Sequence, residues 1–484
     1  MFLFLFGILA LILGYFTYGR FIERLLGPDN RPTPAIADAD GVDTLPLPKW
    51  KNLLIQLLNI AGVGPVIGVI IGIKFGIKCF WIIPLGCILG GAVHDYVSGF
   101  ISLRNGGINL PELTRRALGN LYYKVYVLFV ILLLLLVVAV FVNIPSQLLM
   151  SFVPASTSSV PYFWGAAVLI LLYYIASTIF PVDRIIGKIY PFFGALLLIG
   201  SLAMFLALCW NGFLSPTLLT ETESFKAGMF TDQPVIPCLF VTIACGIISG
   251  FHATQSPIVA RTMKHEREAR VTYYGMMIAE GVIAMIWAAA GLAIYNTFPE
   301  LMASKPALAL KAATEHFLGS GIGIITIVSV IILAITSGDT ALRSLRLTLA
   351  EYVHVPQQPL KNRILICLPP ILGVILLLWW SNRDATSFEW LWKYFAWGNQ
   401  ILSASTLMAC TVWLMRQGKC PWVTLLPGIF MTFVVTSFIL WSDVSHAGCP
   451  YGFNLPLTTA YTLAGIITLL CAAWVIKCGK KPIP

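Results

Sequence analysis

Five ionisable side chains lie inside long apolar runs of this 484-residue sequence: His94, Asp95, His252, Glu280 and Asp339. At the centre of a membrane helix an ionised side chain costs roughly 2.5–3.5 kcal/mol on insertion scales, so each needs a partner or a water-filled cavity. A carboxyl group in such surroundings holds a proton more readily than in water, and it can then exchange that proton near neutral pH. Asp95, Glu280 and Asp339 are therefore predicted to couple a proton to another process.

Structural roles compete with this interpretation. Asp339 and Arg343 stand four residues apart on one helix face, where they would form an ion pair. Asp95 would cap or brace the loop that bears Arg104, and His252 would bond to a carbonyl group freed by a helix break. Both kinds of role stay open for the three carboxyls, whereas His252 is favoured as functional because it sits at a break.

Two apolar segments, interrupted by glycine, resemble each other across half the chain. The first reads Asn59-Ile-Ala-Gly-Val-Gly-Pro-Val-Ile-Gly68 and the second reads Thr242-Ile-Ala-Cys-Gly-Ile-Ile-Ser-Gly-Phe-His252. Glycine and proline free backbone groups that lipid cannot satisfy, so such breaks persist where they line a cavity. A matched pair in two halves points to the binding site of a secondary transporter. The residues predicted to bind substrate here are Gly62, Val63, Gly64, Pro65, Gly246, Gly250, Phe251 and His252.

Close helix packing is the alternative explanation for these glycines, and Gly86-x-x-x-Gly90 fits it. Pro65 favours a true break, because proline also removes a backbone donor. The N-termini of half-helices carry a positive dipole end and unpaired N–H groups, which favour a bound carboxylate. A small organic acid is thus a reasonable substrate, and Asn399 and Gln400 on a later span would line its cavity or join helices.

The composition indicates a membrane protein. Apolar residues make up 58% of the chain and charged residues only 11%, against roughly 25% in soluble proteins. The net charge of +10 is dispersed among loops, so nucleic-acid binding is not expected. Eleven cysteines include no CxxC pair, and the sequence indicates no disulfide framework, zinc site or other metal or cofactor.

The apolar runs predict an all-α integral membrane fold with about thirteen spans. They lie near 2–19, 53–73, 79–101, 123–150, 162–180, 186–210, 235–256, 272–295, 320–350, 364–380, 388–415, 421–441 and 457–477. The first has no basic residue before its apolar core and no clear cleavage site, so we interpret it as a retained span rather than a signal peptide.

The distribution of basic residues predicts the orientation. With the N-terminus outside and the C-terminus in the cytoplasm, 24 of the 31 Lys and Arg residues fall on the cytoplasmic side. The two glycine-broken spans are five spans apart, so they enter the bilayer from opposite sides and belong to inverted five-helix repeats. The predicted parts are an extra helix and linker (1–52), two repeats (53–210 and 235–415) and two C-terminal helices with a tail (421–484).

At these motifs the chain resembles the carbon starvation protein family. The matching stretches begin with Ile60-Ala-Gly-Val-Gly-Pro-Val-Ile-Gly68, Gly90-Gly-Ala-Val-His-Asp95 and Phe240-Val-Thr-Ile-Ala-Cys-Gly-Ile-Ile-Ser-Gly-Phe-His-Ala253. Asp339-Thr-Ala-Leu-Arg-Ser-Leu-Arg346 and Trp397-Gly-Asn-Gln400 follow in the family's order, and Thr33-Pro-Ala and Asp40-Gly-Val-Asp43 look like its N-terminal stretch. The resemblance covers nearly the whole chain from residue 30 onward.

The resemblance implies a multi-pass inner-membrane transporter related to the amino acid–polyamine–organocation superfamily, with a five-plus-five inverted repeat. Family members are associated with pyruvate uptake by proton symport and, by older assignment, with peptide uptake. The residues that fall on family motifs are Gly62, Gly64, Pro65, Asp95, Gly246, Gly250, His252, Glu280, Asp339, Arg343, Asn399 and Gln400. The chain is much shorter than the founding members, and Ala253-Thr-Gln-Ser-Pro257 departs from their pattern, which puts the substrate in doubt.

Several functions compete at this point. The leading hypothesis is proton-coupled uptake of a small carboxylate across the bilayer, and peptide uptake is the runner-up. Sodium is the alternative ion, held by carbonyls of the broken helices with Thr336, Ser337 or Thr340. A membrane enzyme using His94 and Asp95 is disfavoured because no nucleophile, metal or phosphate motif accompanies them. A nutrient-sensing receptor and a passive channel are the remaining classes, and the oligomeric state is left open.

Overall fold

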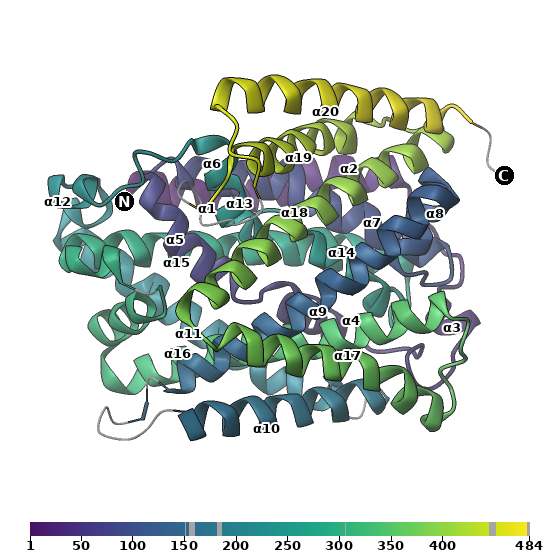
Figure 1. The fold of residues 1–484 in the computed structure, drawn as a ribbon, viewed down its shortest axis with the longest axis horizontal. Helices are drawn as coiled ribbons and strands as arrows, with labels where there is room; N and C mark the ends of the chain where they lie inside the picture. The colour runs from purple at the N-terminus through teal and green to yellow at the C-terminus, as the bar shows by residue number, and fades with distance from the viewer. Residues whose placement is uncertain (151, 154–159, 182–185, 305, 445–451, 482–484) are drawn as a thin grey trace.

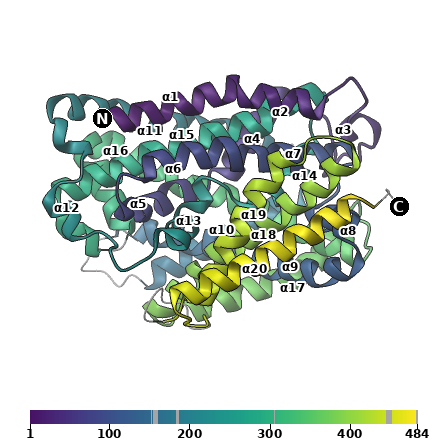
Figure 2. The ribbon, with the colours of Figure 1, turned by 90° about the horizontal axis from the view of Figure 1, so that it is seen from above.

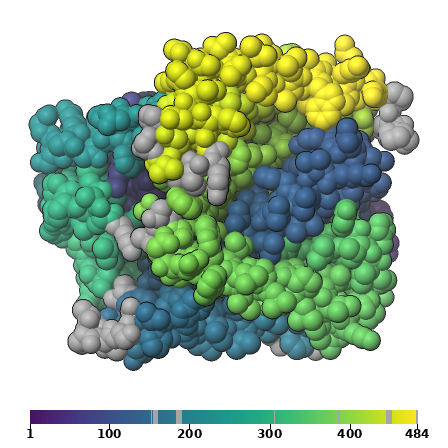
Figure 3. All heavy atoms as spheres, viewed as in Figure 1, coloured from purple at the N-terminus to yellow at the C-terminus, as the bar shows by residue number. Residues whose placement is uncertain are grey.

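The computed structural model describes residues 1–150, 152–153, 160–181, 186–304, 306–444 and 452–481. All regular secondary structure in these residues is helical. Figures 1 and 2 show long helices packed side by side, with α10 and α20 at opposite edges in Figure 1 and α1 along a third edge in Figure 2. Figure 3 shows α20 covering one edge of the face that α9, α17 and α18 share.

The long helices form the bundle. They are α1 (Phe2–Phe16) with α2 (Tyr18–Leu26), α7 (Ala92–Arg104), α9 (Asn120–Met150), α10 (Val160–Ile179), α11 (Ile186–Leu214), α15 (Met276–Thr297), α16 (Pro306–Tyr352), α17 (Leu360–Ser381), α18 (Ala385–Arg416), α19 (Trp422–Trp441) and α20 (Leu457–Gly479). Shorter helices complete it: α3 (Pro34–Ala37), α4 (Lys49–Ile60), α5 (Val69–Gly72), α6 (Cys79–Gly86), α8 (Leu110–Leu118), α12 (Glu223–Ala227), α13 (Phe240–Ile243) and α14 (Gly250–Ala260).

Burial separates inner helices from outer ones. In the most apolar stretch of the span Glu266–Thr297, which contains α15, 89% of residues are buried, against 28% in the spans that hold α1 and α20. The outer helices expose large apolar side chains such as Leu469, Trp210 and Phe213. Contiguous apolar surface of this kind is stable against lipid rather than water, so the bundle is that of a multi-pass membrane protein.

The number of spans agrees closely with the sequence prediction. Among the described residues, eleven helical segments are long and apolar enough to cross a membrane, and the bent pair Lys49–Ile60 and Gly64–Phe75 makes a twelfth. The predicted span at 388–415 corresponds to α18, which is long but less apolar because Asn399, Gln400 and several hydroxyl side chains lie on it. The predicted span at 320–350 is part of α16, which starts at Pro306 and is interrupted at Gly319, where φ is +70°.

The first predicted break is present in the structure. Helix α4 ends at Ile60, and a π-helical turn begins at Gly64 and continues into α5, with a bend of 51° between the two halves. Pro65 has no N–H to give to the preceding turn. The local sequence therefore ends one half-helix and starts another at the depth of the bundle core.

The second predicted break lies between Gly246 and Gly250. Helix α13 and a following 3-10 turn end at Gly246, Ser249 is extended, and α14 starts at Gly250. The fold is thus an all-helical membrane bundle in which the first helix of each half is broken. The residue limits predicted for the two repeats and the terminal parts stay predictions.

The two breaks pack directly against each other. A Cβ atom added at Gly64 would overlap Cys245 Cβ, and one added at Gly246 would lie 3.1 Å from Pro65 Cα. Only a residue without a side chain fits where two backbones approach this closely. The glycines serve this close approach as well as the breaks.

Replacing Gly64 by Ala is expected to destabilise the protein by about 1–3 kcal/mol, as overpacking of a tight core does. Thermal unfolding in detergent measures the effect. Gly165→Ala is the matched control, because that glycine is exposed on α10 with no atom within 4 Å of the added Cβ. Cys245→Gly in the Gly64→Ala background should restore stability, and a double variant as unstable as the single one would contradict the contact.

Candidate functional site

A small cavity of about 10 Å³ lies between the two breaks, which is room for roughly one water molecule. Nine residues line it: Ile60, Gly62, Gly64, Pro65, Phe141, Cys245, Ser249, Phe251 and Phe395. They come from both broken helices and from α9 and α18. In this conformation the centre of the molecule is closed around the breaks.

Four half-helix ends meet at this central cavity. The C-terminal ends are those of α4 at Ile60 and of the turn that closes α13 at Gly246, and the N-terminal ends are at Gly64 and Gly250. Helix N-terminal ends carry partial positive charge and favour a carboxylate, while C-terminal ends favour a cation. Helix ends of both signs therefore face one cavity, which in this closed conformation has room for about one water molecule.

Asn399 holds the start of α14 in place. Its Oδ1 accepts a hydrogen bond from Phe251 N at 2.7 Å, and its Nδ2 donates to Ser249 Oγ at 2.8 Å and to Cys245 Sγ at 3.1 Å. A buried amide that uses both ends in this way fixes the geometry of the backbone it caps. Asn399 bridges the second break from α18 and does not line the central cavity.

Next to Phe251, His252 belongs to a cluster of four buried side chains, two carboxylic acids and two imidazoles, which we call the acid–imidazole cluster. Asp95 Oδ1 lies 2.8 Å from His94 Nδ1, and Asp95 Oδ2 lies 3.0 Å from His252 Nδ1. The other ring nitrogen of His252, Nε2, lies 3.6 Å from Glu280 Oε2. The four side chains are at most 1% exposed, and they come from α7, α14 and α15, so the fold brings together residues that are up to 186 positions apart.

Glu280 is the member of the acid–imidazole cluster with the fewest hydrogen bonds. Among the residues that the structure describes, neither of its carboxyl oxygens has a hydrogen-bond partner, and His94 Nε2 has none either. Within the described residues, no Lys or Arg forms an ion pair with the four side chains. An unpaired carboxylate is costly to bury, and Glu280 is the carboxyl group of this cluster with the fewest partners among the described residues.

Asp339 lies in a separate place on α16. Its Oδ2 accepts a hydrogen bond from Tyr173 OH at 2.8 Å, and its Oδ1 has no hydrogen-bond partner within the described part of the chain. The local ion pair considered as an alternative role is not what the structure shows, because Arg343 Nη1 binds Asp43 Oδ1 at 2.5 Å instead. The structure therefore has two separate buried acidic sites: Glu280 of the acid–imidazole cluster on α15, and Asp339 on α16.

The predicted substrate-binding residues fall into two groups. Gly62, Gly64, Pro65 and Phe251 line the central cavity. Val63, Gly246, Gly250, His252, Asn399 and Gln400 lie beside it without lining it in this conformation. Gly250 packs against the backbone of α18 at Asn399 and Ser403, and Gln400 Oε1 accepts from Ser403 Oγ at 3.3 Å while its Nε2 is unpartnered.

Phe141 and Phe395 are site residues that sequence reasoning did not identify. Their rings lie 5.8 Å apart, and Phe141 lies 5.8 Å from Phe251. Both occur in ordinary apolar runs, so no local signal distinguishes them from core residues. His94, by contrast, is recognisable in the sequence as a candidate, because it is an ionisable residue directly before Asp95 in a predicted membrane span.

The hydroxyl groups considered for a sodium site do meet the first broken helix. Thr336 Oγ1 and Ser337 Oγ both donate to the Leu58 carbonyl oxygen, at 3.0 and 3.3 Å. These hydroxyls satisfy a carbonyl near the C-terminal end of α4, which is a structural role. The Thr340 hydroxyl donates within α16, to Thr336 O and Ser337 O.

A larger cavity of about 550 Å³ lies beyond the aromatic side of the centre. It is lined by Ile67 and Ile71 from the second half of the first broken helix and by Trp392 and Lys393 of α18, among others. The Trp392 and Phe395 rings are 5.5 Å apart, and Phe395 lines the central cavity. One turn of α18 therefore separates this larger cavity from the centre.

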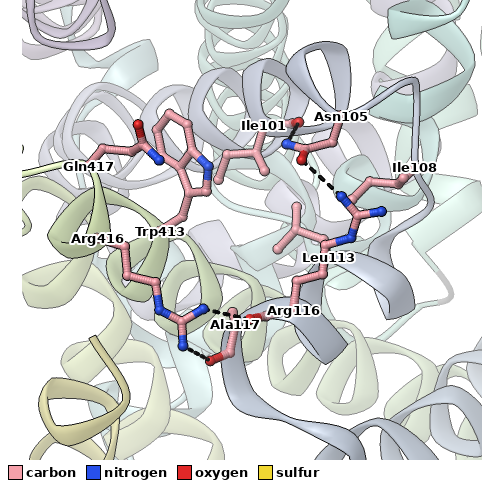
Figure 4. Close-up of a pocket in the computed structure, with 9 residues that line it drawn as sticks. All are labelled: Ile101, Asn105, Ile108, Leu113, Arg116, Ala117, Trp413, Arg416 and Gln417. Atoms are coloured by element: carbon pink, nitrogen blue, oxygen red, sulfur yellow. Dashed lines mark hydrogen bonds between the residues drawn. The ribbon is translucent and has the colours of Figure 1, made fainter. Parts of the chain in front are cut away.

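Another cavity, of about 350 Å³, lies at the end of α18 next to α7 and α8. Figure 4 shows Trp413 between Asn105 and Arg416, with Arg416 donating to the carbonyl groups of Arg116 and Ala117. No residue predicted for the site lines it.

Comparison with known proteins places the chain in a family. The family described as "Carbon starvation protein CstA" matches residues 1–186, 164–317 and 303–438. An "Uncharacterized membrane protein" of Haemophilus influenzae is 41% identical over 340 residues, covering 60% of this chain and 91% of that protein.

Relatives with a named activity are more distant. The "Peptide transporter CstA" of Campylobacter jejuni is 27% identical, covering 57% of this chain and 47% of that protein. The "Pyruvate/proton symporter BtsT" of Escherichia coli is 24% identical, covering 57% and 46%. The chain thus aligns with about half the length of these named transporters.

Solved structures show the same fold at low identity. A Na⁺-coupled sialic acid symporter in a substrate-bound outward-open state gives a TM-score of 0.55 at 14% identity, covering 98% of this chain and 96% of that one. MhsT in complex with L-phenylalanine gives 0.57 at 11% identity, covering 89% and 99%. These neighbours are helical membrane transporters, in agreement with the all-α membrane fold predicted from the sequence. The family match, the relatives and the fold agree, and the chain is a multi-pass membrane protein of the carbon starvation protein family, whose named members are transporters.

Proposed function

We propose that this protein is a secondary active transporter that takes up a small carboxylate such as pyruvate together with a proton. The observation that carries the proposal is the convergence of four half-helix ends on a cavity beside the acid–imidazole cluster of His94, Asp95, His252 and Glu280. The two N-terminal ends suit a carboxylate. A proton carried with a monocarboxylate makes the step electroneutral.

The proton site in this proposal is Glu280 with His252. Glu280 has no hydrogen-bond partner, and His252 links it to Asp95, which in turn contacts His94. Protonation of the acid–imidazole cluster lowers the negative charge beside Gly246 and Phe251, where substrate binding would add a carboxylate. Proton binding and substrate binding therefore favour each other by electrostatics.

Alternating access would connect the centre to each side in turn. The 550 Å³ cavity stands on one side behind Trp392 and Phe395. By the distribution of basic residues this is the outer face of the inner membrane, with the N-terminus outside and the C-terminus in the cytoplasm. The central cavity of about 10 Å³ holds no substrate-sized molecule, so substrate entry requires movement of the aromatic side chains.

Peptide uptake is the second candidate, because several relatives carry that name. Sodium coupling is the alternative to proton coupling, because the Thr336 and Ser337 hydroxyls stand at the end of α4. Both are separated from the main proposal by the uptake measurement below. The oligomeric state plays no part in the proposal.

Labelled pyruvate should accumulate above equilibrium in proteoliposomes that contain the purified protein, when an inward proton gradient is imposed. The gradient supplies the driving force, since proton and substrate move together. Sodium is varied separately, and short peptides are added as competitors. Accumulation driven by sodium alone, or lost to peptide competition, would contradict the proton–pyruvate assignment.

Glu280→Gln should reduce proton-driven accumulation by about tenfold or more, equivalent to about 1.4 kcal/mol, because the variant cannot bind the coupled proton. Exchange of labelled for unlabelled pyruvate should persist, since the substrate site is intact. Glu300→Gln, at an exposed position, is the matched control. If Asp339→Asn abolishes accumulation while Glu280→Gln does not, the proton site lies at Asp339 and the acid–imidazole cluster has a structural role.

A further inference from the structure

A loop near the N-terminus lies across one end of the bundle. We call residues 29–47, between α2 and α4, the strap; it includes α3, which Figure 2 shows at the same end as α7 and α14. In space the strap runs alongside the segment that comes after α14. Thr33 Oγ1 donates to Met263 O at 2.6 Å, and Leu45 N and Leu47 N donate to Arg261 O and Thr262 O. The strap is thereby fixed to the end of the second broken helix.

Asp43 projects from the strap into the bundle. Its Oδ1 accepts from Arg343 Nη1 at 2.5 Å and from Arg346 Nη2 at 2.8 Å, and Oδ2 accepts from Arg346 Nη2 at 2.8 Å. Both arginines are 0% exposed and Asp43 is 4% exposed. The other Arg343 bonds go to the carbonyl groups of Ser177 and Phe180 at the end of α10.

The hydrogen bonds of this cluster are incomplete. Both guanidinium groups bond to the one carboxylate of Asp43, and the remaining contacts of Arg346 are neutral, to Thr178 Oγ1 and Gln357 Oε1. Asp339, four residues before Arg343 on α16, is the other acidic group near Arg343, but it forms no ion pair with it. Among the described residues Arg343 Nε has no hydrogen-bond partner, and a buried guanidinium N–H without a partner favours an anionic acceptor.

The arginines also lie on the helix that contacts the first break. Ser337 Oγ of α16 lies 3.2 Å from the position of a Cβ atom at Gly62. Arg343 follows Ser337 by six residues on α16, about 9 Å along the helix, with Asp339 between them. Arg343 is thus nearer to the centre along α16 than Arg346, which follows it by three residues.

We propose that Arg343 and Arg346 form a second binding subsite for the transported carboxylate, which Asp43 occupies in this conformation. This inference rests on the proposed uptake of a small carboxylate. When the strap withdraws, the substrate carboxylate takes the place of the Asp43 carboxylate, so the two buried arginines keep one anionic partner throughout. Asp43 is then an internal competitor that closes the route until substrate displaces it.

The cluster is not itself a proton switch. Burial raises the pKa of Asp43, but Arg346 and Arg343 lower it by more, and the balance holds it at about 2. A carboxyl whose pKa is lowered on folding stabilises the protein above its unfolded pKa of about 3.9, and this stability is lost only as the pH falls toward 2. Asp43 therefore stays charged at neutral pH, and an arriving carboxylate rather than a proton must displace it.

Asp43→Ala should create an anion site that small carboxylates fill. The purified variant should be less thermostable than the wild type, and acetate or pyruvate should raise its melting temperature by about 2 °C or more for each tenfold increase in concentration. Chloride at equal ionic strength should have a smaller effect. Asp38→Ala, which removes an exposed carboxylate of the same strap, is the matched control and should show no acetate dependence.

Adding Arg343→Gln to the Asp43→Ala variant should abolish the acetate effect. If Asp43→Ala does not fold without carboxylate, Asp43→Asn keeps the side-chain shape and should show a larger pyruvate-dependent melting shift than the wild type. Equal shifts with chloride and acetate, or an acetate effect that survives Arg343→Gln, would overturn the subsite. These measurements need no transport, so a failed uptake assay and a failed subsite remain distinguishable.

Discussion

Backbone groups freed in an apolar medium need partners inside the protein, and this need shapes the centre of the molecule. The Leu58 carbonyl near the end of α4 accepts from two hydroxyls of α16. The Gly246 carbonyl accepts from Cys87 Sγ, and Phe251 N donates to Asn399. Three different helices thus supply polar side chains because two other helices are broken. The less apolar character of α18 has the same origin.

Two buried charge clusters of different kinds flank this centre. The cluster of Asp95, His252 and Glu280 with His94 includes no arginine or lysine among the contacts described. The other cluster joins Arg343 and Arg346 to the carboxylate of Asp43. In the transport that we propose, the carboxylate moves from beside the first cluster, where a proton relieves the negative charge, to the second, which holds two guanidinium groups.

The sequence was sufficient to predict both breaks and nearly all spans, because glycine, proline and long apolar runs leave strong local signals. It was insufficient for pairings made over distance. Arg343 has a plausible local partner in Asp339, yet its carboxylate is Asp43, 300 residues away. Phe141 and Phe395 carry no signal, since their role follows only from the helices they face. Asn399 was expected to line the cavity or join helices, and only the structure shows which backbone it caps.

The contact between the two breaks also limits how the halves can move. Gly64 and Cys245 approach so closely that no further side-chain atom fits between their backbones. Sliding one half along the other would bring Pro65 or Val66 into that space and would collide, whereas turning about the contact leaves the spacing unchanged. In the alternating access that we propose, this contact is the pivot: displacements are small beside it and increase with distance along each half-helix. Trp392, on the side of the larger cavity, and the strap do not line the central cavity at this contact, and a small rotation would displace them the most.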